Sequence, residues 1–588
     1  MPHETRRSAR EAAAAASSEE RLSDSQPSQE KRKLVRRVLL AVLALLLVMA
    51  VWLVVKVFVA KESLEAAQEA VRSLQGGGET RDAVQELADH AATASGATAD
   101  PIWMAAEFLP AVGDNFRGVR LAAETLDVMA NDVAVPVLSD SGGGESGLLA
   151  RALAALESAA PRISELSGDV RAISASPSLI GPVKSGVGQV SEVMELAEPV
   201  FDVLPQLLGG EGERNYLLVF QNNAEALPLG GSSASQTLIT ADNGALEISA
   251  QANSGSFVEG QFVDLEIPTS AKALYGDRYG SYINLAPSQP DWPGVARMIE
   301  AFWNRDIDDT RIDGVISVDP VALERVLLAT GPIEVDGVRL DESNAVKILL
   351  SDVYRWWDPY TDPDLKSDKF FAGVADAVFG RIASGDFDIK DMVWAVSESI
   401  ESGSVMAWLR EPEAQRVVEA SGRLSGVLPS DNSSSTVAGV YFRNVSASKI
   451  DYYLDTAVDA TLTCANGVAE LTATATLTLD ITQAEADALP RYVQSRRMKG
   501  EVFGTQVFMY APPGMEVVST ETSGDASPFR QGHVDLGRQV SPFQMRLVPE
   551  GSATVTTTFR GDGDFGDLDV WTTPMIRATE VSLSDTCG

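Results

Sequence analysis

Residues 214–231 read RNYLLVFQNNAEALPLGG, and here the helical pattern of the preceding chain gives way to a buried strand. The run 216–220 is apolar without interruption, which predicts a strand covered on both faces. Asn222 and Asn223 follow with side chains that suit turns, and Pro228 and two glycines come next. We therefore predict a strand that opens into a polar loop, the kind of position where α/β proteins place their sites.

The chain is too long for one hydrophobic core. At 588 residues, and with about 150 residues per domain, it predicts three or four globular units. Its 83 acidic and 47 basic residues give a formal net charge of -36. Such a surface repels polyanions, so we expect no nucleic-acid partner.

A membrane anchor is predicted near the N-terminus. Residues 1–37 lack an apolar period, which predicts a disordered tail, and they end in the basic cluster 31–37. Residues 38–60 are apolar and would form about 34 Å of helix, enough to cross a hydrocarbon layer of about 30 Å. A cleaved signal peptide is the alternative, but Phe58 lies where a small residue should precede the cut.

The position of the charges predicts the orientation of this anchor. The positive-inside rule keeps residues 1–37 in the cytoplasm and places the chain after Lys61 outside, in a single-pass plasma-membrane protein. The chain has two cysteines, Cys464 and Cys587, and an even pair in an exported domain predicts one disulfide; two free thiols are the alternative.

Residues 61–210 carry apolar side chains at helical spacing, which predicts an extracellular, membrane-proximal helical hairpin or bundle. Glycine triplets at 76–78 and 142–144 interrupt the pattern. The apolar clusters 102–104 and 108–110 either pack between these helices, which we favour, or lie on the lipid surface.

An α/β core is predicted over residues 211–340, because strands alternate with helices there. Asp319 and Pro320 form an N-cap and a first helical position. The predicted strands are 216–220, 236–240, 245–250, 262–267 and 314–318, and the predicted helices are 294–303 and 320–328. We expect a mostly parallel or mixed sheet with helices packed on it.

The rest of the chain predicts a helical part of the core domain, residues 341–432, and then a β-rich domain, residues 433–588. The helices expected in the first are 343–357, 366–384 and 389–409. The strands expected in the second are 439–444, 451–460, 468–479, 506–510, 515–520, 544–547, 553–559 and 579–583. Short strands at this spacing favour an immunoglobulin-like β-sandwich.

Few residue patterns in the chain predict catalysis. The three histidines, His3, His90 and His533, belong to different predicted regions, so neither a Ser-His-Asp centre nor a zinc site is expected. The P-loop (Walker A) sequence is absent, and we predict no cofactor.

Polar residues near the predicted strand ends are the candidate ligand-binding residues. They are Asn222, Asn223, Glu225, Asp264, Asp277, Arg278 and Asn284. Carboxylates here could hold Mg²⁺, and Arg278 could face a phosphate. Asx turns, helix caps and a solvated acidic face explain the same residues without a ligand. If the loop after residue 221 is structural, Asn222 and Asn223 should bond local backbone, and Leu227 and Leu229 should pack inward.

Four stretches together resemble the DUF4012 family, membrane-anchored envelope proteins of actinobacterial type. They are NNAEALPLGG at 222–231, INLAPSQPDWP at 283–293, DGVISVDPVALERVLLATGPIEV at 313–335 and VYFRNVSASKIDYYLD at 440–455. More remotely, the α/β part is similar to the LytR-CpsA-Psr fold, whose members transfer undecaprenyl-pyrophosphate-linked glycopolymers to the cell wall.

The chain departs from both patterns at positions that carry charge in those families. Thr269 and Ser270 take the place of an Arg-Asp pair, and Leu227 takes the place of an arginine. The loss of such guanidinium donors weakens a pyrophosphate site.

The resemblance implies a membrane-anchored extracellular cell-envelope protein that binds or organises cell-wall or polysaccharide components. Plasma-membrane lipid, a cell-wall glycan, a polyprenyl lipid or an envelope protein would be its partner. The alternative is a metal-dependent transferase or hydrolase acting on polyprenyl-pyrophosphate-linked glycans, for which Mg²⁺ would be required.

Overall fold

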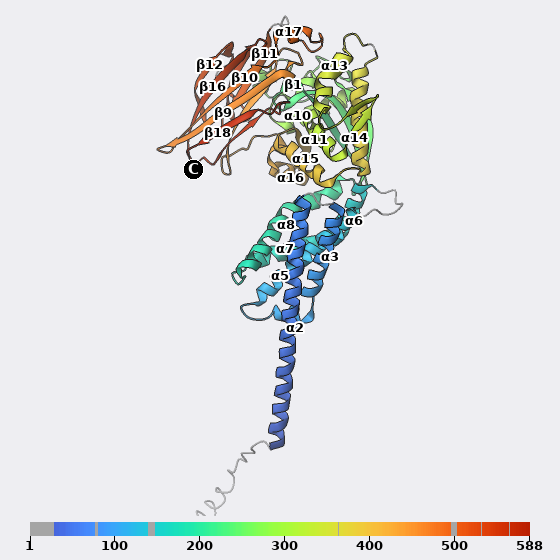
Figure 1. Ribbon diagram of the computed structural model, residues 1–588. Coiled ribbons are helices and arrows are strands. Elements are labelled where there is room, and N and C mark those ends of the chain that lie inside the picture. Colours follow the sequence, from blue (N-terminus) through green and yellow to red (C-terminus); the bar gives the residue numbers. More distant parts are fainter. Residues whose placement is uncertain are drawn as a thin grey trace, which may run out of the picture.

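The structure is a computed structural model that describes residues 29–76, 80–138, 147–362, 364–494, 502–530, 532–563 and 565–587. The predicted tail before residue 29 and the glycines 142–144 lie outside these ranges. Figure 1 shows a long helix that carries a helical bundle around its upper half, with a head of sheets and helices beyond the bundle.

The long helix, α2, runs without interruption from Gln29 to Gly76. Its stretch Leu40–Val71 is long and apolar enough to cross a membrane. The prediction of disorder is wrong for residues 29–37, which are helical. Lys, Arg, Glu, Gln and Leu dominate this segment and favour helix, and the neighbouring apolar span supplies the nucleus from which the helix extends.

The bundle confirms the predicted helical region. Its helices after α2 are α3 (Thr80–Thr98), α4 (Pro101–Ala106), α5 (Gly113–Asp127), the π-helical η1 (Val128–Ala134), α6 (Val135–Leu138), α7 (Leu148–Ser174) and α8 (Gly181–Leu207). Buried alanines such as Ala60 on α2 and Ala97 on α3 allow close helix packing. Leu121, Ile163 and Val170 form a second core between α5, α7 and α8.

A five-stranded mixed sheet forms the centre of the head. Its strands are β1 (Arg214–Leu227), β2 (Gly230–Asp242), β3 (Ala245–Asn253), β4 (Gly314–Val318) and β7 (Val405–Leu409). They lie in the order β3-β2-β1-β4-β7, and β1 and β4 pair in parallel. Leu217, Val219 and Val315 share one core with the helix α10 (Trp292–Asp306). Tyr216 and Ala407 face a second core on the other side of the sheet.

Four predicted elements differ in the structure. In one, the predicted strand 451–460, residues 451–453 belong to the 3-10 helix η6 (Ile450–Tyr453) and the strand begins at Leu454. Residues 222–227 are the end of β1 and not a loop, because Gly231 of β2 lets the two backbones approach: a Cβ there would lie 2.2 Å from the Asn222 carbonyl oxygen. Residues 262–267 form an irregular segment and not a strand, although Val263 and Ile267 are buried. Residues 405–409 are β7 and not helix, because Gly403 ends the preceding helix with a φ of 74°.

Helices and a short hairpin cover this sheet. They are α9 (Thr269–Tyr275), η3 (Ile283–Ser288), α10 (Trp292–Asp306), α11 (Pro320–Thr330), β5 (Ile333–Val335), β6 (Val338–Leu340), α12 (Ala345–Lys347), η4 (Ile348–Asp352), α13 (Val353–Trp356), α14 (Lys366–Ser384), α15 (Ile389–Glu401), α16 (Pro412–Ala420) and η5 (Gly422–Ser425). Asp319 is the N-cap of α11, and its side chain accepts a hydrogen bond from the Ala322 N–H at 2.8 Å.

Two further sheets make up the β-rich part. One has the order β12-β16-β10-β9-β18, and the other has the order β13-β15-β11-β8-β17, with β14 paired to β15. Their elements are β8 (Thr436–Asn444), η6 (Ile450–Tyr453), β9 (Leu454–Ala465), β10 (Val468–Leu479), α17 (Gln483–Ala488), β11 (Phe503–Tyr510), β12 (Glu516–Ser523), β13 (Ala526–Pro528), β14 (His533–Asp535), β15 (Arg538–Leu547), β16 (Ser552–Asp562), β17 (Leu568–Thr572) and β18 (Glu580–Asp585).

These two sheets share one core, in which Val458, Leu471, Val507 and Phe559 are buried. The disulfide predicted from the two cysteines is present between Cys464 and Cys587. The outer face of the β8 sheet packs against the α/β part, where Tyr441, Phe508 and Trp571 join the core of α10. The β-rich part therefore covers one side of the α/β core and does not form a separate domain with its own isolated core.

Candidate functional site

The end of β1 brings an acid to a buried lysine. The Glu225 carboxylate lies 3.0 Å from Lys449 Nζ, and the Ser232 hydroxyl donates to the other Glu225 oxygen at 2.5 Å. The Lys449 ammonium lies 4.7 Å from the ring centre of Tyr354 and 5.2 Å from that of Tyr492. Burial alone would lower the pKa of Lys449, but Glu225 and the two tyrosines outweigh it and raise that pKa. Lys449 is therefore charged at neutral pH.

A second carboxyl group, that of Asp451, is buried two residues further along. One oxygen accepts hydrogen bonds from the Ala226 N–H at 2.8 Å and from Asn444 Nδ2 at 2.7 Å. The other oxygen has no partner among the described residues. Burial raises the pKa of Asp451 to about 7, against the two hydrogen bonds, which lower it. This group can therefore exchange a proton near neutral pH.

Asn222 and Asn223, near the end of β1, are bonded inside the protein. Asn222 Nδ2 donates to the Tyr354 hydroxyl at 2.8 Å, and its oxygen accepts from the Ala224 N–H at 3.1 Å. Asn223 Nδ2 donates to Asp319 at 2.8 Å and to the Pro574 carbonyl at 3.0 Å. Burial raises the pKa of Asp319. These bonds tie β1 to three distant parts of the chain.

Leu227 and Leu229 pack inward, with exposed fractions of 3% and 4%. The turn between β1 and β2 therefore presents no apolar patch through these leucines. An arginine at position 227 would have to bury its charge.

The other four candidate residues lie elsewhere, around α9 and η3. Asp264, Asp277 and Arg278 are exposed, and Asn284 is half-buried. The segment of Asp264 runs beside the turn of Asp277, because the Val263 N–H donates to the Gly280 carbonyl at 3.1 Å. Arg278 stacks 4.9 Å from the ring centre of Tyr282. Within the described ranges no hydrogen bond or ion pair joins these residues to the Glu225 cluster, and no group of three or more His, Cys, Asp or Glu side chains is placed to hold a metal ion.

Lys449, Asp451 and the tyrosines were not among the predicted site residues. Lys449 lies 224 residues from Glu225 along the chain, so no local spacing could join them. One feature of the sequence could have linked them. Glu225 and Lys449 both belong to stretches that carry the family resemblance, 222–231 and 440–455.

Aromatic side chains lie between this cluster and the surface: half-buried Tyr492 contacts Lys449, Tyr360 packs on Tyr492, and Trp356 follows Tyr354 by two residues. We call Trp356, Tyr360 and Tyr492 the aromatic rim. Tyr360 packs on Tyr492 with ring centres 5.1 Å apart, and Tyr492 packs on Tyr354 at 5.4 Å. Trp356 and Tyr360 are 46% and 42% exposed. The neighbouring elements α13 and α17 lie at the end of the head farthest from the free end of α2 (Figure 1).

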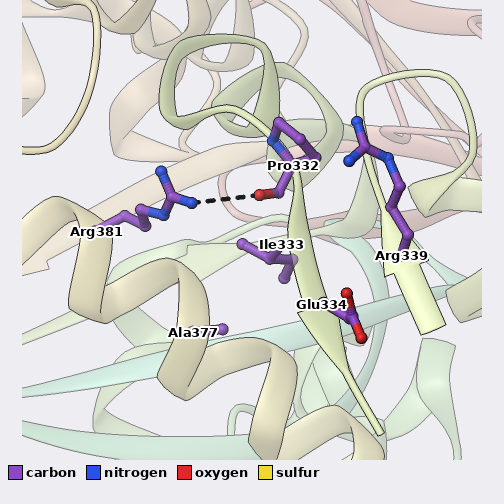
Figure 2. A pocket seen from close by; sticks show the side chains of 6 residues that line it. All are labelled: Pro332, Ile333, Glu334, Arg339, Ala377 and Arg381. Carbon is purple, nitrogen blue, oxygen red and sulfur yellow. Dashed lines mark hydrogen bonds between the residues drawn. The ribbon is translucent and has the colours of Figure 1, made fainter. Parts of the chain in front are cut away.

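A hollow of about 340 Å³ lies between the β5–β6 hairpin and α14 (Figure 2). It is lined by Pro332, Ile333, Glu334, Arg339, Ala377 and Arg381. Arg381 donates to the carbonyls of Thr330 and Pro332 and pairs with Asp386 at 2.9 Å. Arg339 lies 3.5 Å from Asp341. Both guanidinium groups thus have partners within the protein, which makes this hollow a weaker candidate for an anion than its two arginines suggest.

Comparison with known protein families gives a match to part of this head. Residues 211–354 match the family described as a protein of unknown function, DUF4012. The match includes the whole of β1 and the Asn222–Tyr354 bond. It leaves out Lys449 and Asp451, which complete the cluster.

Two solved structures show limited similarity. The transcriptional regulator yvhJ from Bacillus subtilis is 16% identical, and the alignment covers 35% of this chain and 76% of that one with a TM-score of 0.21. The Lin1025 protein from Listeria innocua is 14% identical, with coverage of 36% and 78% and a TM-score of 0.20. No curated protein matches the chain.

Proposed function

We propose that this protein is a single-pass anchor of the cell envelope that binds a cell-wall or polysaccharide component at the aromatic rim. The observation that carries the proposal is the arrangement of the molecule. One continuous helix, α2, contains the apolar span and supports the bundle, and α13, which carries Trp356 of the rim, lies at the far end of the head. A ligand there would be held away from the bilayer, toward the wall, with the head outside the cell.

The chemistry of the rim suits a sugar. Aromatic faces of Trp356 and Tyr360 can cover the apolar face of a sugar ring, and the partly exposed Glu225 carboxylate can accept hydrogen bonds from hydroxyl groups. Lys449 holds that carboxylate in place. The net charge of -36 opposes polyanionic polymers, so a neutral or amino-bearing glycan is the expected class.

The test is glycan binding by the full-length protein in lipid nanodiscs. We expect a neutral wall polysaccharide to bind, and Tyr360→Ala and Glu225→Gln each to weaken binding about tenfold, which corresponds to about 1.4 kcal/mol. Trp394→Ala is the matched control, because Trp394 is an exposed tryptophan on α15, 49% accessible, outside the rim.

Equal binding by all variants would place the ligand elsewhere. Binding restricted to polyprenyl-pyrophosphate-linked glycans, with a transfer or hydrolysis product that requires Mg²⁺, would instead establish the enzymatic alternative.

A further inference from the structure

The connection between α4 and α5 exposes a run of apolar side chains at the lower end of the bundle. Residues 104–112 read MAAEFLPAV, and we call them the foot. Phe108 is 89% exposed, and Met104, Leu109 and Val112 are each about half exposed. Neighbouring large apolar side chains on a soluble surface mark an interaction site.

The foot presents no unpaired charge. Its one ionisable residue, Glu107, is held by Arg120, whose Nε and Nη2 donate to the two carboxylate oxygens at 2.6 and 3.3 Å. Such a bidentate pair turns the carboxylate toward the bundle. The foot can therefore leave water without desolvating a lone charge.

Contacts at both ends hold the foot rigidly. Trp103, which precedes it, is buried and donates its indole N–H to the Phe116 carbonyl at 3.0 Å. The two rings of Trp103 and Phe116 pack edge to face, 5.1 Å apart. The apolar side chains are therefore displayed by a fixed segment.

The same region is fastened to the apolar helix. Asp100 accepts a hydrogen bond from the indole of Trp52 on α2 at 3.0 Å and lies 3.6 Å from the ammonium of Lys56. Leu53 packs against the core of Ala97 and Trp103. The residues that lead into the foot thus contact residues 52–56 of α2. Figure 1 shows that α2 enters the bundle at its lower end.

The length of α2 sets the depth of that contact. If Arg37 marks one boundary, a hydrocarbon layer of about 30 Å takes about 20 residues at 1.5 Å each and ends near Val57. Trp52 then lies about 8 Å inside the other boundary, which matches the depth of about 5–10 Å at which interfacial segments bury apolar side chains.

We propose that the foot is a second membrane contact, which inserts Phe108 and Leu109 into the leaflet that α2 crosses on the side of the bundle. The lipid of that bilayer is the occupant. The predicted cluster 102–104 and 108–110 therefore divides: Trp103 is core, and the exposed side chains of Met104, Phe108 and Leu109 face lipid. This contact would fix the tilt of the bundle and head relative to the membrane, beyond simple tethering. It rests on the anchoring part of the proposed function.

The experiment uses the full-length protein in phosphatidylethanolamine and phosphatidylglycerol vesicles. Phe108→Cys carries an environment-sensitive fluorophore, attached without reductant so that the native disulfide is kept. Val193→Cys is the control, because Val193 is 59% exposed on α8 of the same bundle. Flotation shows first that each protein is anchored.

We expect the label at position 108 to be quenched by lipids brominated on the acyl chains, and to be at least about threefold less accessible to aqueous iodide than the label at position 193, as for an interfacial segment. Equal iodide quenching at the two positions in floated protein overturns the proposal while leaving the anchor intact. Shielding from iodide without bromolipid quenching also overturns it, since a protein contact would then cover the foot. Failure of the protein to float would refute the anchor itself.

Discussion

Asp451 shows how one buried carboxyl group can make this head sensitive to pH. Burial destabilises its charged form, while the hydrogen bonds from Asn444 and the Ala226 N–H stabilise it. The unpartnered oxygen leaves burial as the larger effect, and the nearby Glu225 carboxylate acts in the same direction. The protonated form is therefore favoured in the folded state.

The sign of the resulting pH dependence follows from linkage. The pKa of Asp451 rises to about 7 on folding, from about 3.9 in the unfolded chain. Its contribution to stability is fully present below about pH 4 and is lost as the pH rises through about 7, at up to about 1.4 kcal/mol per pH unit.

We expect the Asp451→Asn variant to lack this pH-dependent contribution. The melting temperature of the variant should therefore fall less than that of the wild type between pH 5 and pH 8.

Asp459→Asn is the control for this measurement, because it removes an exposed carboxylate from β9. Its pH profile should follow that of the wild type. Parallel profiles for Asp451→Asn and Asp459→Asn would show that Asp451 is ionised throughout this range.

At the scale of elements, β18 is the strand with the least side-chain burial in the β-rich part. All of its side chains are exposed, and it pairs in parallel with the edge of β9, from Glu580 opposite Ala457 to Asp585 opposite Leu462. The Cys464–Cys587 disulfide joins the end of this strand to β9. Backbone pairing and the disulfide, with little apolar burial, therefore hold β18 in place.

Removal of the disulfide should release this strand first. The two cysteines are 123 residues apart, and closing such a loop stabilises the folded state by about 4 to 5 kcal/mol in the chain-entropy model. We expect Cys464→Ser with Cys587→Ser to lower the melting temperature and to speed hydrogen exchange in β18 more than in β10.

Ser584→Ala, an exposed change on β18, should leave the exchange rates as they are in the wild type. Unchanged protection of β18 in the double variant would show that backbone pairing with β9 suffices.

At the scale of the whole molecule, the continuous helix α2 leads to a testable prediction of membrane topology. The helix begins at Gln29, before the basic residues 31–37, and ends at Gly76 within the bundle. If α2 crosses the membrane as we propose, the bundle and head lie on the side opposite the basic cluster.

A protease added to intact protoplasts should digest the bundle and head and leave a short fragment that carries the basic cluster. Immunoblotting with tags at each end of the chain would measure this. Survival of the head until the protoplasts are opened would reverse the proposed orientation.

Much of the architecture follows from local sequence. The apolar run 38–60 determines one helix that is long enough to cross a membrane, and Asp319 with Pro320 determines where α11 begins. The spacing of turn residues predicts a strand over 468–479, and β10 is that strand. These features depend on neighbours within a few residues, so periodicity and capping suffice to find them.

Only the tertiary structure decided the parts that depend on distant partners. Residues 222–227 read as a polar loop, yet they form a strand because Gly231, Tyr354, Asp319 and Asp451 satisfy their backbone and side chains. Residues 405–409 form a strand because they pair antiparallel with the otherwise unpaired edge of β4. Pairing between residues far apart in the chain determines how deeply a polar group is buried, and therefore its pKa and its chemistry. A short window of sequence does not contain both partners, so it cannot predict these properties.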